Sequence, residues 1–592
     1  IAHVDHGKTT LSNNLMKQTR GKEEAALASM DSNVLEAERG ITILAKNAAL
    51  EYKGVKINLI DTPGHADFGG EVERILNMAD ACVLLVDAQE GPMPQTKFVL
   101  KLAIKLNKKV LVCINKVDKP NARPSWVLDT TFDLFASLGA CDEQCDFPVS
   151  YASGFLGKAS VEGPDKLQDD LMPLLDQILE QCPKPIAKAD MPLQMLVSNL
   201  DYDDHLGRVC IGRIVSGSLK VGQEIGIKYG EVGTMRTTKI SKLYEFNNNG
   251  RREINEVLAG DICAFTGSDK DVVIGDTVVD PKDPRPLPPI EVQEPTVELE
   301  FGPNCSPLAN KDINTKWVTS AHIRARLEKE CLTNLALRFS PDGNENFKVK
   351  GRGTLQLGIL LENMRREGFE MMVGAPQVLT RKDPETKKVE EPWEEATIET
   401  PDEYQNDIME ELLRVGGELQ NMGDGSMKGL TQLIFHIPTK MLIGMQNKLM
   451  MMSRGQAVLS AQFLRWGVYK SGDYKAREQG SIANSAEGEA NHFSLGKMGK
   501  FGGFFVEHGT PVYPGMVVGI NNKAENIEVN IAKGKGSDNM RNKNKETAET
   551  VSPVIRMGID EYLGWMDTDE KLEVTPGALR LVKCNSKALS AR

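Results

Sequence analysis

Apolar and polar positions alternate in two different ways along this chain. Over residues 1–185, short apolar runs alternate with amphipathic stretches; 83–87 is typical of a buried parallel strand and 95–106 of a helix. This alternation predicts an α/β domain with a mostly parallel sheet, ended by the prolines of 182–185. From 190 to 280 the apolar runs are shorter and are separated by glycines, as in 207–217, which predicts a β-barrel.

The second half of the chain predicts three further modules. Five prolines within 281–289 indicate a stiff linker after the barrel. Residues 290–385 and 392–473 each combine strand runs with helices and predict two small α+β domains. Residues 474–592 are glycine-rich with short strands, which predicts a β-rich C-terminal domain.

The first ten residues contain a candidate phosphate-binding loop. Ala2 is followed by four residues and then Gly7-Lys8-Thr9, which matches the pattern G-x-x-x-x-G-K-[ST] except that alanine replaces the first glycine. In such loops backbone N–H groups surround phosphates, the lysine reaches the terminal phosphates and the hydroxyl ligates Mg²⁺. The candidate phosphate contacts are Asp5, His6, Gly7, Lys8, Thr9 and Thr10.

Two later motifs supply further candidate phosphate and Mg²⁺ contacts. Thr42, within 39–43, offers a lone hydroxyl suited to hold Mg²⁺ when a γ-phosphate is present. Asp61 ends the apolar run 57–60, from where its carboxylate can reach the Mg²⁺ shell and the Gly64 N–H can face the γ-phosphate. The candidate metal ligands are therefore Thr9, Thr42 and Asp61.

A third group of residues predicts recognition of guanine. The Asp118 carboxylate can accept two hydrogen bonds from the N1–H and 2-amino group of guanine, a donor pair that adenine lacks. Ser153 opens a last loop that can close over the base. These motifs in this order are specific for a guanine-nucleotide switch. The candidate contacts are Asn115, Lys116, Val117, Asp118 and Ser153.

Other interpretations of some of these residues remain open. His3, His6 and His65 with Asp5 could form a metal cluster, although they lack the i, i+4 helical spacing and a cysteine partner. His65 could also be a solvated loop histidine. The pair at 141 and 145 has a metal-like spacing, but no second cysteine pair follows it, so ordinary cysteines are the better explanation.

Composition limits the class of protein. The 592 residues are enough for about four domains, and 40% hydrophobic content is enough for several cores. The sequence has no apolar run of the ~18 residues that cross a bilayer, and its ten scattered cysteines fit a reducing compartment. We expect the initiator methionine and most of the first strand to precede Ile1, so a targeting peptide is neither indicated nor excluded.

A net charge of −12 argues against indiscriminate binding of nucleic acid, but two spans are locally basic. Residues 533–545 carry five cations against one aspartate, and 438–480 carry seven against two carboxylates. Both suit docking onto an RNA backbone, and a solvated charged loop is the alternative. The candidate RNA contacts are Lys533, Lys535, Arg541, Lys543 and Lys545.

The motifs at 3–10, 39–43, 61–65 and 115–118 resemble those of translational GTPases. The stretches 36–47, 351–357, 362–369 and 553–557 resemble one branch in particular, the TypA/BipA family, and the resemblance covers essentially the whole chain. An elongation-factor-G-like translocase would carry a long extra domain between the two α+β modules, where this chain has only the short connector 383–392. The resemblance therefore implies a factor without the element that moves tRNA during translocation.

The resemblance implies the fold of each module. We expect a P-loop GTPase domain over 1–185 and a translation-factor β-barrel over 190–280. Two ferredoxin-like domains should follow over 290–385 and 392–473, the second like domain V of elongation factor G, and 474–592 should be a family-specific domain.

The resemblance also implies a function and its residues. The chain would bind the ribosome in the GTP state and hydrolyse GTP with Mg²⁺, acting in translation, large-subunit assembly and stress adaptation. His65 would orient the attacking water behind a hydrophobic gate of Val4 and Ile41, and the loop 533–545 would contact rRNA or the tRNA acceptor end. Relatives have Ser-Ala where this chain has Ser153-Gly154, which predicts a looser loop and somewhat weaker nucleotide binding.

Three functional hypotheses follow. The first is a ribosome-activated GTPase, and the second is a GTP-gated rRNA-binding assembly factor in which hydrolysis only times release. The third is a stress-signalling module without ribosomal contact. We expect a monomer with no membrane association, in a bacterial cytoplasm or in an organellar stroma or matrix.

Overall fold

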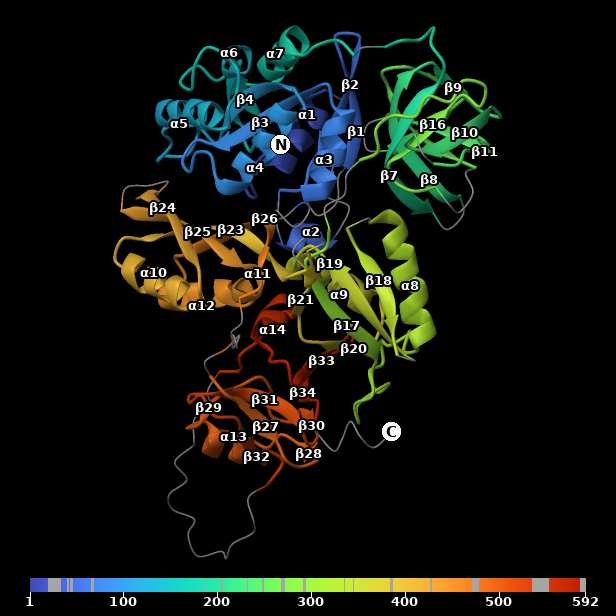
Figure 1. Ribbon diagram of the computed structural model, residues 1–592. Helices are drawn as coiled ribbons and strands as arrows, with labels where there is room; N and C mark the ends of the chain where they lie inside the picture. Colours follow the sequence, from blue (N-terminus) through green and yellow to red (C-terminus); the bar gives the residue numbers. More distant parts are fainter. Residues whose placement is uncertain are drawn as a thin grey trace, which may run out of the picture. The chain divides into compact units, whose positions relative to one another are not determined.

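The computed structural model divides into two compact units, one spanning residues 1–293 and the other most of residues 294–592 (Figure 1). It describes residues 1–19, 34–39, 42, 46–64, 69–185, 187–203, 206–231, 233–247, 250–267, 272–290, 294–334, 336–343, 345–383, 387–425, 429–470, 477, 479–534 and 553–585.

The first unit begins with an α/β domain. Its sheet has the order β3-β4-β5-β6, in which the first three strands are parallel and β6 is antiparallel. Ala2 forms a parallel bridge to Leu85, so the start of the chain extends the sheet beside β3. The strands are β3 (Ala81–Asp87), β4 (Lys109–Asn115), β5 (Val149–Ser153) and β6 (Lys158–Ser160), with a separate antiparallel hairpin of β1 (Lys46–Tyr52) and β2 (Val55–Asp61).

Helices cover both faces of this sheet. Along β3, Leu84 packs with α3, α4 and α5, whereas its neighbour Leu85 packs with α1 and the region of α7, because successive strand residues face opposite sides. The continuous apolar runs of β3 and β4 therefore reflect burial on both faces, as predicted. The helices are α1 (Lys8–Gln18), α2 (Val34–Arg39), α3 (Gly69–Met78), α4 (Pro94–Lys105), α5 (Pro124–Ser137), α6 (Asp142–Cys145) and α7 (Met172–Gln181).

An antiparallel sheet of eight strands follows, in the order β11-β10-β16-β7-β8-β15-β12-β13, beside a ribbon of β9 and β14. It packs on the α/β domain through a shared apolar cluster that includes Ile75 and Met78 of α3 and Ile211 of β8. The strands are β7 (Gln194–Asp203), β8 (Gly207–Ser216), β9 (Ser218–Lys220), β10 (Glu224–Tyr229), β11 (Arg236–Lys239), β12 (Lys242–Asn247), β13 (Gly250–Ile254), β14 (Glu256–Leu258), β15 (Ile262–Thr266) and β16 (Asp276–Val279).

The second unit contains two ferredoxin-like modules. In each, a β-α-β-β-α-β segment forms a sheet in the order second, third, first, fourth strand. The first comprises β17 (Val297–Pro303), α8 (Ser320–Thr333), β18 (Arg338–Asp342), β19 (Asn346–Gly351), α9 (Thr354–Glu367) and β20 (Met371–Gly374). The second comprises β23 (Val389–Pro401), α10 (Gln405–Arg414), β24 (Glu418–Asp424), β25 (Leu430–Pro438), α11 (Thr439–Leu442), α12 (Met445–Met452) and β26 (Val458–Val468).

Short edge strands accompany these modules. β21 (Gln377–Val378) pairs with β17, and β22 (Arg381–Lys382) pairs with β23. Because β23 starts at Val389, the connector between the two modules is shorter than the predicted span 383–392.

The C-terminal segment shares a sheet with the first ferredoxin-like module. β20 pairs antiparallel with β33, and the sheet continues through β34 and β31 to β27 and β32. α14 packs on α9 in the same core, so the two segments fold together although α9 ends at residue 367 and α14 begins only at residue 559. The elements are β27 (Ser481–Asn484), β28 (Gly488–Glu489), α13 (His492–Met498), β29 (Gly502–Phe504), β30 (Pro511–Val512), β31 (Met516–Asn521), β32 (Ile527–Val529), α14 (Ile559–Trp565), β33 (Glu570–Val574) and β34 (Leu579–Lys583).

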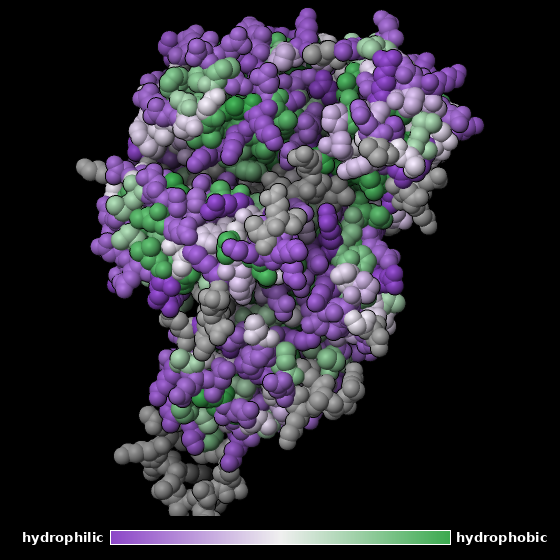
Figure 2. All heavy atoms as spheres, viewed as in Figure 1, coloured by the Kyte–Doolittle hydropathy of each residue, from purple (hydrophilic) through white to green (hydrophobic). Residues whose placement is uncertain are grey.

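Hydrophilic residues dominate the face of the molecule seen in Figure 2, and apolar residues occur there in separate patches. Within the described residues, no helix has the length and the apolarity that crossing a membrane requires.

Candidate nucleotide-binding site

The candidate phosphate-binding loop connects the bridge at Ala2 to the N-terminus of α1. Gly7 directly precedes α1 and has φ +91°, a left-handed conformation that favours glycine. A Cβ atom at Gly7 would also lie 2.6 Å from Nδ2 of Asn115, so both the backbone angle and the space require glycine. The loop thus presents the first backbone N–H groups of α1, which favour an anion because they have no partner within the helix.

Lys8 lies inside this loop. Its Nζ donates to the carbonyls of Ala2 (3.1 Å) and His3 (2.8 Å). Burial lowers the pKa of Lys8 to about 8, although Asp61 and Asp5 act in the opposite direction. A Cβ atom at Gly64 would lie 2.7 Å from this Nζ, so glycine lets the segment after β2 approach the lysine closely.

The three candidate metal ligands converge at the C-terminal end of β2. The Thr9 hydroxyl donates to Oδ2 of Asp61 at 2.8 Å and lies 3.1 Å from the hydroxyl oxygen of Thr42. Burial raises the pKa of Asp61, and the hydrogen bond from Thr9 and the charge of Lys8 oppose this shift. One carboxylate and two hydroxyl oxygens form the hard, incomplete ligand set that Mg²⁺ takes when nucleotide phosphates complete its shell, so these residues fit the ion.

These groups surround a hollow of about 140 Å³. Its lining residues are Val4, Asp5, Gly7, Lys8, Thr9, Thr10, Thr42 and Gly64. The described residues contain no cluster of three or more His, Cys, Asp or Glu side chains that could hold a metal by themselves. This is compatible with a magnesium site, because only one of its protein ligands would be a carboxylate.

Asn115 connects the phosphate loop to the last candidate guanine loop. Its Nδ2 donates to the carbonyl of His6 at 2.8 Å, and its Oδ1 accepts from the Gly154 N–H at 2.9 Å. The side chain is only 1% exposed, so both bonds form away from water. Asn115 thus fixes two segments that are far apart in the sequence.

Lys116 forms a second link beside Asn115. Its Nζ donates to the carbonyl of Asp5 at 2.6 Å and lies 2.8 Å from Oδ2 of Asp87. Val117 donates its N–H to the carbonyl of Ala152 at 3.3 Å. Asp118 is exposed at the same edge, and Ser153 is buried, with its hydroxyl accepting the Leu156 N–H.

Sequence reasoning missed Asp87, which ends β3 and is fully buried. Burial alone would raise the pKa of Asp87, but hydrogen bonds from Lys116 and the Gln89 N–H hold it below its ordinary value. A carboxylate directly after the apolar run 83–86 was the available signal, because the carboxyl ends of neighbouring parallel strands lie at one edge.

Two side chains of α1 were also missed. Asn14 donates to the carbonyl of Gly154 at 2.5 Å, and Gln18 donates to the carbonyl of Gly157 at 2.7 Å. Gln18 also accepts the Leu171 N–H at 2.7 Å. Both hold the turn after β5, and helical spacing could have placed them on one face of α1 but could not have named their partners.

Several predicted residues lie outside the described part of the chain, namely His65, Ile41, Lys535, Arg541, Lys543 and Lys545. Of the predicted gate, Val4 lines the hollow and donates its N–H to Oε1 of Gln95 at 3.2 Å. Of the predicted RNA contacts, Lys533 is described and exposed. The side chain of His6 is buried beside the backbone of Leu85 and Asp87.

The second basic span, 438–480, is largely compensated by carboxylates from elsewhere in the second unit. Lys440 lies 3.0 Å from Glu391, and Lys448 lies 2.8 Å from Glu411. Arg477 makes two hydrogen bonds, of 2.8 and 2.7 Å, to a single carboxylate, Glu570. The local charge count therefore overstates how much positive charge this span offers to RNA.

Family models identify the class of protein. The model of the elongation factor Tu GTP binding domain matches residues 1–184, and that of elongation factor G domain 2 matches 192–281. The models of the elongation factor G C-terminus and of the TypA/BipA C-terminal domain match 388–476 and 479–588. The chain is thus a multidomain GTPase of the translation-factor class.

Sequence identity to individual relatives identifies the family within this class. The chain is 43% identical to the large ribosomal subunit assembly factor BipA of Synechocystis, over 100% of this chain and 98% of the relative. It is 42% identical to the protein of the same name from Escherichia coli K12, over 98% and 95% of the two chains. It is also 42% identical to a chloroplastic protein of Arabidopsis thaliana named as the TypA-like elongation factor SVR3, over 100% and 87%. The chain belongs to the TypA/BipA family of GTPases.

A solved structure is similar in fold. A crystal structure of a protein from Thermus thermophilus matches 79% of this chain and 96% of its own length with a TM-score of 0.52 and 16% sequence identity.

Proposed function

We propose that this chain is a ribosome-associated GTPase that acts in translation and in assembly of the large ribosomal subunit. The observation that carries the proposal is the meeting of Thr9, Thr42 and Asp61 beside the Gly7-Lys8 loop, at the edge where Asn115 and Lys116 also lie. The names of the bacterial relatives, which describe assembly factors of the large ribosomal subunit, support the ribosomal part of the proposal.

In this proposal the phosphate loop binds the β- and γ-phosphates of GTP. The backbone N–H groups of residues 5–10 and the Lys8 ammonium donate to phosphate oxygens, and Gly64 donates its N–H to the γ-phosphate. Thr9, Thr42 and Asp61 would hold Mg²⁺, which when bound neutralises phosphate charge. We expect the Thr42 segment to be held in place only while the γ-phosphate is present, so that hydrolysis releases it.

His65, by the resemblance of 61–65 to the family motif, would orient the attacking water. Val4 and Ile41 would restrict its approach until the ribosome draws it into place. Intrinsic hydrolysis should therefore be slow and ribosome-stimulated hydrolysis much faster.

On the guanine side, Asp118 would accept the N1–H and 2-amino hydrogens, while Asn115, Lys116, Val117 and Ser153 shape the base pocket. The exposed position of Asp118 at the site edge supports this role.

Binding to RNA would be a function of the C-terminal domain, separate from nucleotide binding. Lys533, Lys535, Arg541, Lys543 and Lys545 would bind the backbone of rRNA or of the tRNA acceptor end. We infer a monomer that acts in a bacterial cytoplasm or an organelle, and that contributes to growth under stress.

The first test is GTP hydrolysis with and without purified 70S ribosomes. We expect strong ribosome stimulation in the unchanged chain, and its loss in His65→Ala while GDP binding is retained. His492→Ala, at an exposed histidine of the C-terminal domain, is the matched control and should keep the stimulation. Stimulation that survives His65→Ala would exclude the proposed role of this histidine.

The alternative is a GTP-gated rRNA-binding factor in which hydrolysis only times release. In that case ribosomes would stimulate hydrolysis little, and His65→Ala would accumulate on subunit precursors that still mature. Lys543→Glu with Lys545→Glu tests the RNA contact, and Lys239→Glu with Lys282→Glu gives the same charge change at exposed lysines of the first unit. Ribosome association that is equal in both double variants would contradict the RNA-contact proposal.

A further inference from the structure

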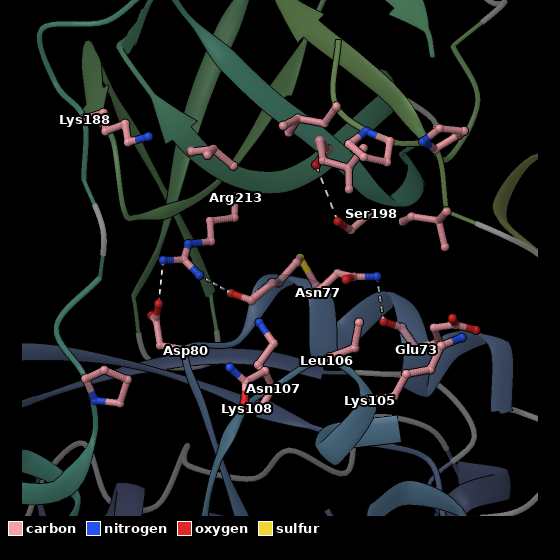
Figure 3. Close-up of a pocket in the computed structure, with 18 of the residues that line it drawn as sticks. Glu73, Asn77, Asp80, Lys105, Leu106, Asn107, Lys108, Lys188, Ser198 and Arg213 are labelled. Atoms are coloured by element: carbon pink, nitrogen blue, oxygen red, sulfur yellow. Dashed lines mark hydrogen bonds and ion pairs between the residues drawn. The ribbon is translucent and has the colours of Figure 1, made fainter. Parts of the chain in front are cut away.

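The first unit contains a second and larger cavity, which shares no lining residue with the hollow at the phosphate loop. Its volume is about 840 Å³, within the ~300–1,000 Å³ typical of small-molecule sites. Figure 3 shows that its walls come from α3 and the end of α4 on one side and from β7 and β8 on the other. The proline-rich segment that follows the eight-stranded sheet, 287–290, also lines the cavity.

Much of the wall is apolar. Met78 and Leu106 contribute from the α/β domain, Leu196 and Val215 from the barrel, and Pro289 and Ile290 from the proline-rich segment. These side chains come from five separate stretches of sequence. They offer a flat or branched hydrocarbon body a surface that excludes water.

The charged groups around this wall are mostly positive. Five cations line the cavity, against two carboxylates, for a net formal charge of +3 in a chain whose total is −12. The cations are Lys105, Lys108, Lys184, Lys188 and Arg213, and the carboxylates are Glu73 and Asp80. The cavity therefore favours an anion.

Two of these cations already have structural partners. Arg213 donates to Oδ1 of Asp80 at 2.6 Å and to the carbonyl of Met78 at 3.2 Å, and Lys108 donates to the carbonyl of Ala79 at 2.7 Å. Both cations thus satisfy carbonyl groups at the C-terminus of α3, where positive charge is favourable.

Three lysines remain available for a ligand. In the part of the chain that the structure describes, the ammonium groups of Lys105, Lys184 and Lys188 form no ion pair, and all three side chains are exposed. Lys105 belongs to α4, whereas Lys184 and Lys188 lie on the segment that leads into β7. Lys105 and Lys188 lie on different walls of the cavity (Figure 3).

We propose that this cavity binds a small amphipathic organic anion, with its apolar body against Met78, Val215 and Pro289 and its acidic group paired with one of two lysines on different walls, Lys105 or Lys188. The combination of an apolar wall with lysines that form no ion pair among the described residues carries the proposal, because an uncharged hydrocarbon would leave the lysines unused and a compact inorganic anion would leave the wall unused. This binding does not require GTP hydrolysis, so it stands or falls independently of the function proposed above.

The test is a titration of the full chain with 8-anilinonaphthalene-1-sulfonate, an aromatic sulfonate that fluoresces when it leaves water. Excess GDP and Mg²⁺ keep the nucleotide site occupied. We expect one saturable site per chain. Lys105→Glu combined with Lys188→Glu should weaken binding by about tenfold or more, and Val215→Trp should block the cavity without changing GDP affinity.

The matched control is Lys101→Glu combined with Lys282→Glu. Lys101 lies one turn before Lys105 in α4 and is likewise exposed, and Lys282 lies near the proline-rich segment of the cavity, but neither lines the cavity. The control should bind the probe as the unchanged chain does. Circular dichroism and GDP affinity verify that each variant is folded, and the lysine variants decide the outcome if Val215→Trp does not fold. No saturable site, or equal weakening in both double variants, would overturn the proposal.

Discussion

At the scale of single residues, two glycines that both face Asn115 should respond in opposite ways to substitution by alanine. Gly7 has a left-handed φ, and an added Cβ would lie 2.6 Å from Asn115; Gly154 has no such φ, and an added Cβ would lie 3.3 Å from Oδ1 of Asn115 and 3.4 Å from Cβ of Leu11. The second environment accepts a methyl group with a small adjustment, and the first does not.

We therefore predict that Gly7→Ala lowers the free energy of unfolding by about 1–3 kcal/mol and greatly weakens GDP binding. Gly154→Ala should change stability by less than about 1 kcal/mol and leave GDP binding equal or tighter, because it restricts the unfolded chain. Denaturant unfolding and calorimetric titration with GDP measure both quantities. If the two substitutions had equal effects on stability and GDP binding, the contact with Asn115 would not distinguish Gly7 from Gly154.

A second residue-scale prediction concerns Lys8 and pH. Its pKa is about 8, and bound phosphates should raise it. As the pH rises from about 7 to 8.5, the free protein loses this proton before the complex does, so GDP affinity should fall, by at most tenfold per pH unit.

The lowered pKa of Lys8 changes the free energy of unfolding with pH in the opposite direction to GDP affinity. Because the pKa in the fold lies below the ordinary value of 10.5, the unfolded chain binds more protons above pH ~8, and this group makes the nucleotide-free fold more stable as the pH rises. Weaker GDP binding at pH 8.5 would thus not reflect unfolding. The control is Lys8→Arg, because arginine keeps its charge throughout this pH range. The GDP affinity of this variant should be weaker than that of the unchanged chain but should not depend on pH. If the GDP affinity of the variant fell with pH as steeply as that of the unchanged chain, the assignment to Lys8 would be contradicted.

At the scale of elements, the pairing of β20 with β33 joins segments that look like separate domains in the sequence. Leu572 of β33 is fully buried in one core with Leu299 and Leu361 of the ferredoxin-like module. The C-terminal strands therefore complete the sheet of that module, so neither segment buries its apolar surface without the other.

We predict that Leu572→Ala destabilises both segments together, by about 2–5 kcal/mol. Hydrogen exchange should show that peptides from α9–β20 and from β33–β34 lose protection to the same extent. Leu433→Ala, which truncates an equally buried leucine in the core of the second ferredoxin-like module, is the control and should leave those peptides protected. Loss of protection in β33–β34 alone would show that the two segments fold independently.

At the scale of the whole molecule, the first unit couples the nucleotide-binding domain to the barrel. Ile211 of β8 shares an apolar cluster with Ile75 and Met78 of α3. Polar contacts flank this cluster, since Lys56 and Asn58 of β2 bond to Asp261 at 2.8 and 2.9 Å. Any stabilisation of α3 by nucleotide should therefore extend into the barrel.

We predict that GDP increases hydrogen-exchange protection in β8 and β15 of the unchanged chain, because a ligand stabilises every element that unfolds with its site. Ile211→Ala should abolish this increase while GDP still protects α1 and β4. Ile225→Ala removes a fully buried isoleucine of the barrel that is not part of the cluster, and it should lower barrel stability but keep the GDP response. An unchanged response in Ile211→Ala would contradict coupling through this cluster.

The sequence by itself determined the order of the modules and the identity of the candidate nucleotide contacts. Periodicity predicted β3, α4 and β8 because apolar spacing records which side of an element is buried, and the P-loop spacing predicted Lys8 because a phosphate cradle needs glycine next to a cation. These signals are local, so they can be read without a structure.

Only the tertiary structure decided what depends on packing between distant segments. The Thr9 hydroxyl meets Thr42 and Asp61, which follow 33 and 52 residues later, and Asn115 bonds to His6 across 109 residues. Packing between distant segments also produces four other features. These are the ion pair of Lys116 with Asp87, the sheet shared by β20 and β33, the ion pairs of the basic span 438–480, and the large cavity. Such contacts depend on how complete sheets and helices pack, and no spacing within one segment of sequence records that arrangement.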